Sequence, residues 1–300
     1  MELDPVIALR RLGTVSDGTT LRRLCDPWQI RVAVQEGRIL RLSRNRYALP
    51  GVGLAPEAAG RLHGTVSHLS AAGVWGWKVK REPALPVITV PPNRKLDAAR
   101  RAGSDVRWQR LADDEVFEGI VTTRTRTAAD CLRTLQFDEA LCVADSVLRE
   151  GRVSRAELEE AVRRSPQPGR RQALTVLEVA DGRAANPFES CLRAVALRVP
   201  RLHVEPQFVV PGIGHADLGD GSIGLLIEAD SHEYHIEKDA FRYDIRRYTA
   251  MVVEGWTVAR FCWEDAMWRQ DRVHADLTRL VARLSPCGRE GGCCGVHRTA

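Results

Sequence analysis

One segment constrains the fold of this 300-residue chain more than any other. It is a nearly continuous apolar run from Ile223 to Ala229, which contains Glu228 and is followed by Asp230. A strand that is apolar on both faces has to be covered on both faces, so it belongs in the centre of a sheet. Glu228 and Asp230 are two residues apart and therefore point to one face of that strand. Buried carboxylates are costly unless something compensates them, so the sequence predicts a functional site at this strand end.

The segment around this run, residues 186–284, alternates helical and strand patterns. We expect a helix over 186–199, strands at 203–210, 214–218 and 223–229, a helix over 236–254, a strand at 256–262 and a helix over 264–284. A turn at Gly219–Gly221 would make a hairpin that brings Asp217 beside Glu228. Like charges so placed repel, and a divalent cation is the natural compensation. Carboxylate oxygens favour Mg²⁺ or Mn²⁺, and Glu189 on the opening helix could add a further carboxylate.

The motifs of this segment resemble the very-short-patch-repair-like branch of the PD-(D/E)XK endonuclease superfamily. They are PFESCLR, HADL, LLIEADSHEYH, FRYDIRRYTAMVVEGW and TVARF. The resemblance implies a restriction-endonuclease-like core of order α-β-β-β-α-β-α that cleaves DNA with Mg²⁺ or Mn²⁺. It implies Asp217 and Glu228 as metal ligands, Asp230 as the third acidic member, Glu189 orienting the site, His232 in proton transfer or water activation, and Asp244 and Arg247 as supporting residues.

Two departures from this branch leave its activity open. Asp230 stands where the superfamily has a catalytic lysine, and Ser231 stands where this branch usually has glycine. The proton-transfer role would then fall to His232, His235 or Lys238. The segment could therefore be a metal-dependent nuclease, or a domain that keeps the fold and only binds.

Residues 1–53 read as a winged helix-turn-helix. Asp26 and Pro27 are a helix cap and first helical residue for PWQIRVAVQEG, and RILRLSRNRYALPG alternates as a β-hairpin does. The hairpin is crowded with basic residues that suit a phosphate backbone, namely Arg38, Arg41, Arg44 and Arg46. A small helical domain whose solvated hairpin docks protein is the alternative.

The middle region, 54–185, is predicted to be a mixed α/β domain. The motifs RYALPG, VSHLSAA, TTRTRTAADCL and ALCVADSVLREGRVSRAELEEAV resemble the AbiEi-type antitoxins of type IV toxin–antitoxin systems, over about residues 1–180. The resemblance implies operator binding by the first domain and antitoxin activity in the second, and hence a possible cognate toxin. Residues 285–300 are expected to be a flexible tail, and oligomeric state stays open.

Charge is distributed unevenly along the chain. The net charge of +5 arises from 44 Lys and Arg against 39 Asp and Glu. Residues 1–53 hold 9 basic and 5 acidic residues, whereas residues 186–286 hold 12 and 15. No targeting signal and no apolar run of membrane length is visible, so we expect an α+β or α/β cytoplasmic protein with no membrane partner. Three functions remain in play: a DNA-binding, metal-dependent endonuclease for defence or repair, a non-catalytic regulator or antitoxin, and a pure protein-interaction scaffold.

Overall fold

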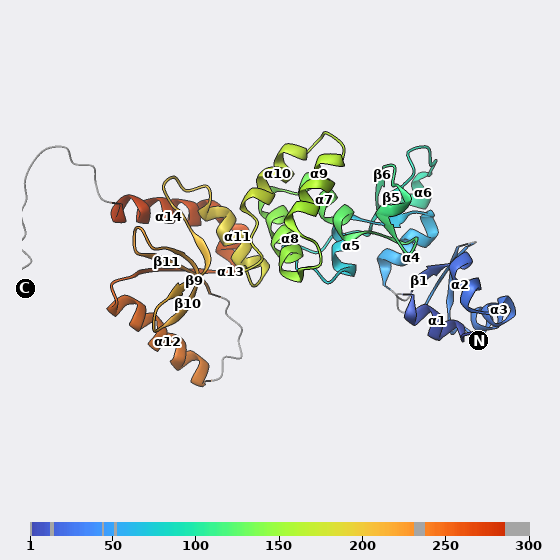
Figure 1. The fold of residues 1–300 in the computed structure, drawn as a ribbon, viewed down its shortest axis with the longest axis horizontal. Coiled ribbons are helices and arrows are strands. Elements are labelled where there is room, and N and C mark those ends of the chain that lie inside the picture. The colour runs from blue at the N-terminus through green and yellow to red at the C-terminus, as the bar shows by residue number, and fades with distance from the viewer. Residues whose placement is uncertain (1, 13–14, 44, 51–52, 231–237, 286–300) are drawn as a thin grey trace, which may run out of the picture. The chain divides into compact units, whose positions relative to one another are not determined.

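A computed structural model describes residues 2–12, 15–43, 45–50, 53–230 and 238–285. The chain divides into two compact units, Met1–Ser190 and Cys191–Ala300, and each is described by itself (Figure 1). Helices are combined with three sheets of three, four and five strands, which confirms the predicted α+β class. Within the described residues, no helix is both long enough and apolar enough to cross a bilayer.

The first unit begins with three helices and a small antiparallel sheet. They are α1 (Pro5–Arg11), β1 (Val15–Asp17), α2 (Gly18–Leu24), α3 (Pro27–Gln35), β2 (Leu40–Ser43) and β3 (Arg46–Ala48), with strand order β1-β3-β2. Asp26 caps α3 by accepting hydrogen bonds from the N–H groups of Trp28 and Gln29, and Pro27 begins the helix, as its sequence predicts. The predicted hairpin is present as β2 and β3.

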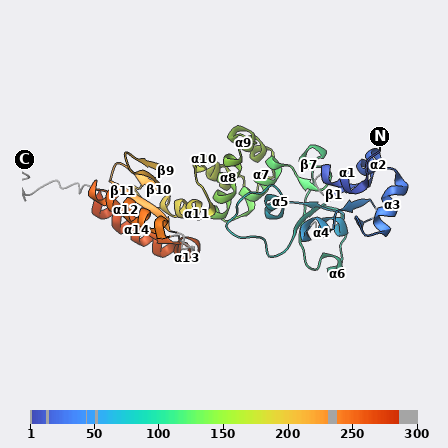
Figure 2. The same ribbon diagram turned by 90° about the horizontal axis from the view of Figure 1, so that it is seen from below.

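The rest of the first unit is a five-stranded sheet followed by a group of helices. The elements are α4 (Leu54–Leu62), β4 (Thr65–Val66), α5 (His68–Val74), β5 (Val87–Val90), α6 (Ala98–Arg101), β6 (Asp105–Trp108), β7 (Val116–Phe117), β8 (Val121–Thr122), α7 (Arg124–Thr134), α8 (Phe137–Glu150), α9 (Arg155–Arg164) and α10 (Arg170–Val179). The strand order is β6-β5-β4-β8-β7. Helices α7 to α10 pack together (Figures 1 and 2).

One apolar core runs across the predicted boundary at residue 53. It joins Val15 and Ala48 of the N-terminal sheet to Leu62, Val66 and Ile88 of the following segment. A methyl group at position 60 would lie 2.4 Å from Cβ of Leu42, so only glycine lets α4 approach the hairpin this closely. The two segments that the sequence separates therefore share a core.

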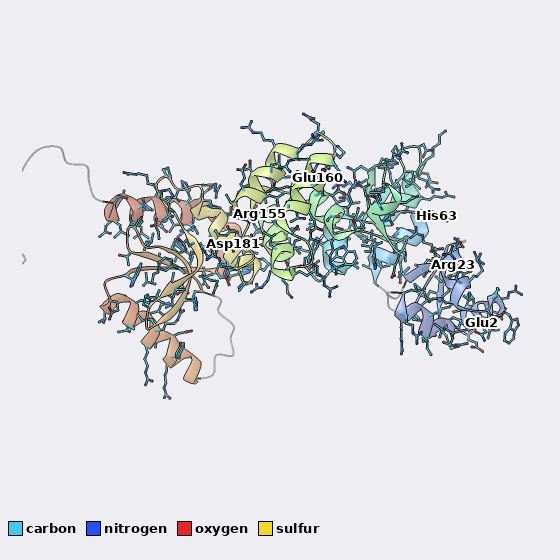
Figure 3. All side chains as sticks on the ribbon, in the orientation of Figure 1. Glu2, Arg23, His63, Arg155, Glu160 and Asp181 are labelled. Carbon is cyan, nitrogen blue, oxygen red and sulfur yellow. The ribbon has the colours of Figure 1, made fainter. Side chains whose placement is uncertain are left out.

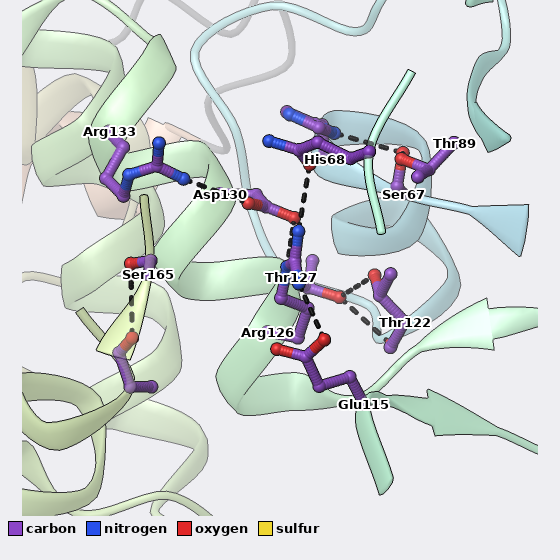
Figure 4. A network of polar contacts seen from close by, with 12 residues as sticks. Ser67, His68, Thr89, Glu115, Thr122, Arg126, Thr127, Asp130, Arg133 and Ser165 are labelled. Atoms are coloured by element: carbon purple, nitrogen blue, oxygen red, sulfur yellow. Dashed lines mark hydrogen bonds and ion pairs between the residues drawn. The ribbon is translucent and has the colours of Figure 1, made fainter. Parts of the chain in front are cut away.

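A buried ionic network fixes α7 within the first unit. Asp130 is fully buried between Arg126 and Arg133, as Figure 4 shows. Arg126 Nε donates to Asp130 at 2.7 Å and its other nitrogens reach Glu115 and Gln109, while Arg133 donates twice to the carbonyl of Pro168. The RTAAD motif is thus explained by structure, in contrast to exposed charges such as Arg23 on α2 and Glu160 on α9 (Figure 3).

The second unit is a four-stranded mixed sheet with helices. Helix α11 (Pro187–Ala196) spans the division between the units, and β9 (Glu205–Val210), β10 (Gly214–Asp220), β11 (Leu225–Asp230), α12 (Lys238–Val253), β12 (Thr257–Cys262), α13 (Trp263–Trp268) and α14 (Gln270–Leu284) follow. The strand order is β12-β11-β10-β9, with β11 parallel to β12 and antiparallel to β10. Figure 1 shows α12 and α14 on opposite sides of this sheet.

The central position of β11 is confirmed, and two local expectations are wrong. Strand β10 extends to Asp220, so the hairpin turns after that residue rather than at Gly219–Gly221. Gly219 belongs to the strand, where it pairs with Leu226 and Glu205, and Phe208 packs directly over it, so that a Cβ would lie 2.4 Å from the ring. The expected single helix over 264–284 is broken at Arg269, which separates α13 from α14.

Candidate functional site

The hairpin of β10 and β11 brings Asp217 and Glu228 together. Leu218 pairs with Ile227, and the next position of this register sets Asp217 opposite Glu228. Asp217 Oδ2 accepts a hydrogen bond of 2.7 Å from the backbone N–H of Ala229, which fixes its carboxylate at the strand end. Glu228 is only 3% exposed, so its carboxyl group is buried beside that of Asp217. The adjacency predicted for these two residues is thus present.

Burial makes this pair hold a proton. Desolvation, and then the neighbouring charge of Asp217, raise the pKa of Glu228 to about 7, although Arg247 opposes the rise. Burial also raises the pKa of Asp217, and the Ala229 N–H opposes that rise. Ionisation of one carboxyl group therefore disfavours ionisation of the other, and Glu228 is the group that keeps its proton near neutral pH. A cation arriving between them could replace that proton.

Arg247 of α12 holds Glu228 in place. Its Nη1 donates to Glu228 Oε1 at 2.9 Å and to the carbonyl of His215 at 2.8 Å, and its Nη2 donates to the hydroxyl of Tyr248 at 3.3 Å. Asp244, one turn earlier on the same helix, lies 3.9 Å from Arg247 Nε. The predicted supporting pair is thus brought to the site, with Arg247 spanning two strands of the sheet.

Asp230 lies in an ion pair with Arg260 of β12. Arg260 Nη2 donates to Asp230 Oδ2, and its guanidinium lies 3.9 Å from the centre of the Tyr248 ring. The parallel register pairs Arg260 with Glu228, so this arginine reaches the acidic strand end from the neighbouring strand. Sequence reasoning did not select Arg260, and the only available signal was its place in the TVARF motif, close to the end of a strand.

Two of the predicted catalytic residues, Glu189 and His232, stay predictions. Glu189 accepts hydrogen bonds from the N–H of Ala185 at 2.7 Å and from Asn186 Nδ2 at 2.8 Å, so it closes the first turn of α11. It belongs to the first unit, and its role in orienting the site stays a prediction. His232 lies outside the described residues, as do Ser231 and His235.

The residues at the strand end suit a divalent cation as a pair. In the described part of the chain, no group of three or more His, Cys, Asp and Glu side chains is gathered as a metal site. Mg²⁺ commonly needs only one or two protein carboxylates, because waters and substrate phosphates supply its other ligands. Asp217 and Glu228 fit that requirement, since burial raises the pKa of both carboxyl groups and a bound cation would offset that cost.

The N-terminal arginines have different surroundings, since some line a hollow and another forms ion pairs. Arg41 lines a hollow of about 300 Å³ together with Arg22 and Arg31, which sequence reasoning missed; Pro27, Ile30, Val34, Gln35 and Tyr47 complete its wall. Arg38 is ion paired with Asp4 at 2.8 Å and with Glu36 at 2.7 Å. Arg46 is largely buried, which lowers its pKa. Arg44 lies outside the described residues.

Comparison with known proteins finds similar chains in one genus. No protein-family model matches the chain. The uncharacterized proteins MT2308 and Rv2248, from two strains of Mycobacterium tuberculosis, are each 27% identical over 280 residues, which covers 87% of this chain and 98% of theirs. The crystal structure of the RV2827C protein from Mycobacterium tuberculosis aligns with a TM-score of 0.34 and 14% identity, over 63% of this chain and 78% of that one. The mycobacterial likeness at 27% identity thus extends over most of the chain.

Proposed function

We propose that this chain is a DNA-binding protein whose second unit is a metal-dependent endonuclease, which hydrolyses phosphodiester bonds in a defence or repair context. The observation that carries the proposal is the placement of Asp217 opposite the buried Glu228 in one hairpin, where burial and the charge of Asp217 raise the pKa of Glu228 to about 7. Such a strongly raised pKa beside a specific charge partner is typical of functional sites. Mg²⁺ or Mn²⁺ bound there would supply Lewis-acid chemistry and a more acidic water.

Each residue of the candidate site has a separate role in the proposal. Asp217 and Glu228 hold the cation through carboxylate oxygens. The Ala229 N–H orients Asp217, and Arg247 orients Glu228 from α12. Proton transfer to or from the attacking water is assigned to His232 on the strength of the sequence resemblance alone.

The topology of the second unit supports the same proposal. A β9-β10-β11 meander leads through α12 to β12, which lies parallel to β11 at the sheet edge. This order agrees with the restriction-endonuclease-like core that the motifs imply. It also sets the acidic strand end beside α12, whose Arg247 contacts both β10 and β11.

The test is nicking of supercoiled plasmid by the purified full chain with Mg²⁺ or Mn²⁺. Asp217→Asn and Glu228→Gln keep the shape of the side chains but remove the charge that would hold the cation, and each is expected to reduce nicking by about 10²-fold or more. Asp271→Asn, which changes an exposed acid at the start of α14, is the matched control and should nick normally. Nicking that survives both site substitutions would reject the site.

The hollow lined by Arg22, Arg31 and Arg41 favours a second candidate, a non-catalytic transcriptional regulator or antitoxin of a type IV-like system. Guanidinium groups gathered on one side of a helix and hairpin suit phosphate contacts. We expect salt-dependent binding to DNA upstream of the chain's own gene, weakened by Arg22→Ala with Arg31→Ala. Arg38→Ala is the control, because its charge is already balanced by Asp4 and Glu36. Equal binding by all variants would reject this DNA-binding surface.

A further inference from the structure

Two of the described arginines reach the candidate site, and they differ in side-chain exposure and in the number of hydrogen bonds that they make. Arg247 is mostly buried, with 16% of its side chain exposed, and its donors are used by Glu228, His215 and Tyr248. Arg260 has 44% of its side chain exposed and, among the residues that the structure describes, makes a single hydrogen bond, from Nη2 to Asp230. Its Nε and Nη1 have no hydrogen-bond acceptor among the residues that the structure describes. Arg247 is a brace, whereas Arg260 has donors to offer to a ligand.

The position of Arg260 is set by three contacts. Its backbone is the register partner of Glu228 on the parallel strand β12. Its guanidinium lies over the ring of Tyr248 at 3.9 Å, a cation–π contact that holds the planar group. Asp230 anchors one edge of that plane. A pre-oriented guanidinium with open donors is suited to bidentate recognition of phosphate oxygens.

We propose that Arg260 binds the non-bridging oxygens of the phosphate group that is hydrolysed at the cation site formed by Asp217 and Glu228. In this proposal Asp230 positions Arg260 instead of ligating the metal. The proposal deepens the endonuclease function proposed above and rests on it. It makes Asp217 and Glu228 the cation-binding pair, and Arg260 the residue that contacts the substrate. Asp230 acts through Arg260 and is a positioning residue.

The first experiment compares cleavage by Arg260→Met, Arg260→Lys and the control Arg279→Met. Arg279 is an exposed arginine of α14 in the same unit, ion paired with Asp276, so its removal changes the net charge equally. Loss of a donor to a phosphate whose charge rises in the transition state is expected to cost about 10²-fold in kcat. Arg260→Lys should recover part of the rate, Arg279→Met should cleave normally, and all three should keep the thermal midpoint. Cleavage by Arg260→Met at the wild-type rate would overturn the proposal while leaving the nuclease function standing.

The second experiment assigns Asp230, using Mn²⁺ binding to the full chain measured by calorimetry without DNA. If Asp230 serves Arg260, Asp230→Asn keeps the Mn²⁺ affinity within twofold of wild type, whereas Glu228→Gln weakens it by about tenfold or more. An equal loss in both variants would make Asp230 a metal ligand and overturn its positioning role.

A third measurement decides the case in which the wild-type chain does not cleave. Binding of a 20-base-pair duplex is then followed across salt concentrations. Loss of one phosphate contact lowers the slope of log affinity against log salt by about one, so Arg260→Met should show that change and Arg279→Met should not. Identical slopes in the two variants would overturn the role of Arg260, whereas the nuclease function is already rejected by the absence of cleavage.

Discussion

The two units differ in how their buried acidic residues are balanced by neighbouring cations. In the first unit, Asp130 is fully buried between Arg126 and Arg133, and each arginine has further acceptors of its own. In the second unit, Glu228 is 3% exposed beside another carboxyl group, with one arginine for the pair. The charges around Asp130 are balanced by arginines. The pair of carboxyl groups in the second unit has more negative charge than its one arginine can balance.

This difference separates a structural network from a candidate site. A buried charge that is paired and hydrogen bonded stabilises a particular packing, and removing one partner strands the others. A buried carboxyl group that lies beside a second carboxyl group, with one arginine for the two, keeps its proton until a cation replaces it. Substitutions that remove charge should therefore have opposite effects on stability in the two units.

The largest effect is expected for Asp130→Asn. The substitution leaves Arg126 and Arg133 buried without their shared carboxylate, so the free energy of unfolding should fall by about 3–5 kcal/mol. Denaturant unfolding at pH 7 measures it. Glu159→Gln is the control, since its pair with the exposed Arg163 is worth about 0.5 kcal/mol or less. A loss below about 1 kcal/mol for Asp130→Asn would contradict the structural role of the network.

The next effect is the pH dependence of Glu228→Gln. Because the folded-state pKa of Glu228 is raised to about 7 from the usual 4.5, the folded protein holds a proton that the unfolded chain releases between these values. Stability from this group is therefore present below pH 4.5 and is lost as the pH rises to 7. Removing the ionisable group should make the variant more stable than wild type by on the order of 2–3 kcal/mol at pH 8, relative to their difference at pH 4.5.

The measurement is denaturant unfolding of both proteins at pH 4.5, 6 and 8, monitored in the second unit. Asp271→Asn, at an exposed position, should follow wild type at every pH. A difference between wild type and Glu228→Gln that does not change with pH would show that Glu228 ionises normally.

The smallest effect concerns cation binding. Since a cation displaces the proton of Glu228, the Mn²⁺ affinity should increase about tenfold for each unit by which the pH rises toward 7, which corresponds to about 1.4 kcal/mol per unit. Above pH 7 the affinity should no longer change with pH. Calorimetry in buffers of different ionisation enthalpy measures the released proton. Release of no proton at pH 6 would mean that the cation binds elsewhere.

Local pattern was enough to predict many of the elements and one part of the site. The apolar run in β11 requires a central strand, and the short connection to β10 makes the two strands pair as a hairpin. Asp217 and Glu228 meet for that reason. The cap at Asp26 was likewise readable, because it depends on residues a few positions apart.

Local pattern was insufficient where distant segments meet. The length of β10 depends on its pairing with β9, from which Phe208 packs over Gly219, and the shared core across residue 53 depends on the close approach of α4 to the hairpin. The N-terminal arginines resemble one another in the sequence, yet Arg38 is balanced by the distant Asp4 and the neighbouring Glu36, while Arg41 lines a hollow.

The sequence by itself therefore determined that a buried strand ends in acidic residues and that a neighbouring acid pairs with them, because both properties arise within one hairpin. Only the tertiary structure decided how Arg247, expected from the sequence resemblance, contacts those acids, and only it revealed Arg260. Arg247 and Arg260 come from α12 and β12, and their positions depend on how the helix packs on the sheet and on the register of a parallel strand pair. Parallel pairing is reached through a long crossover, so its register is fixed by packing and not by any local turn.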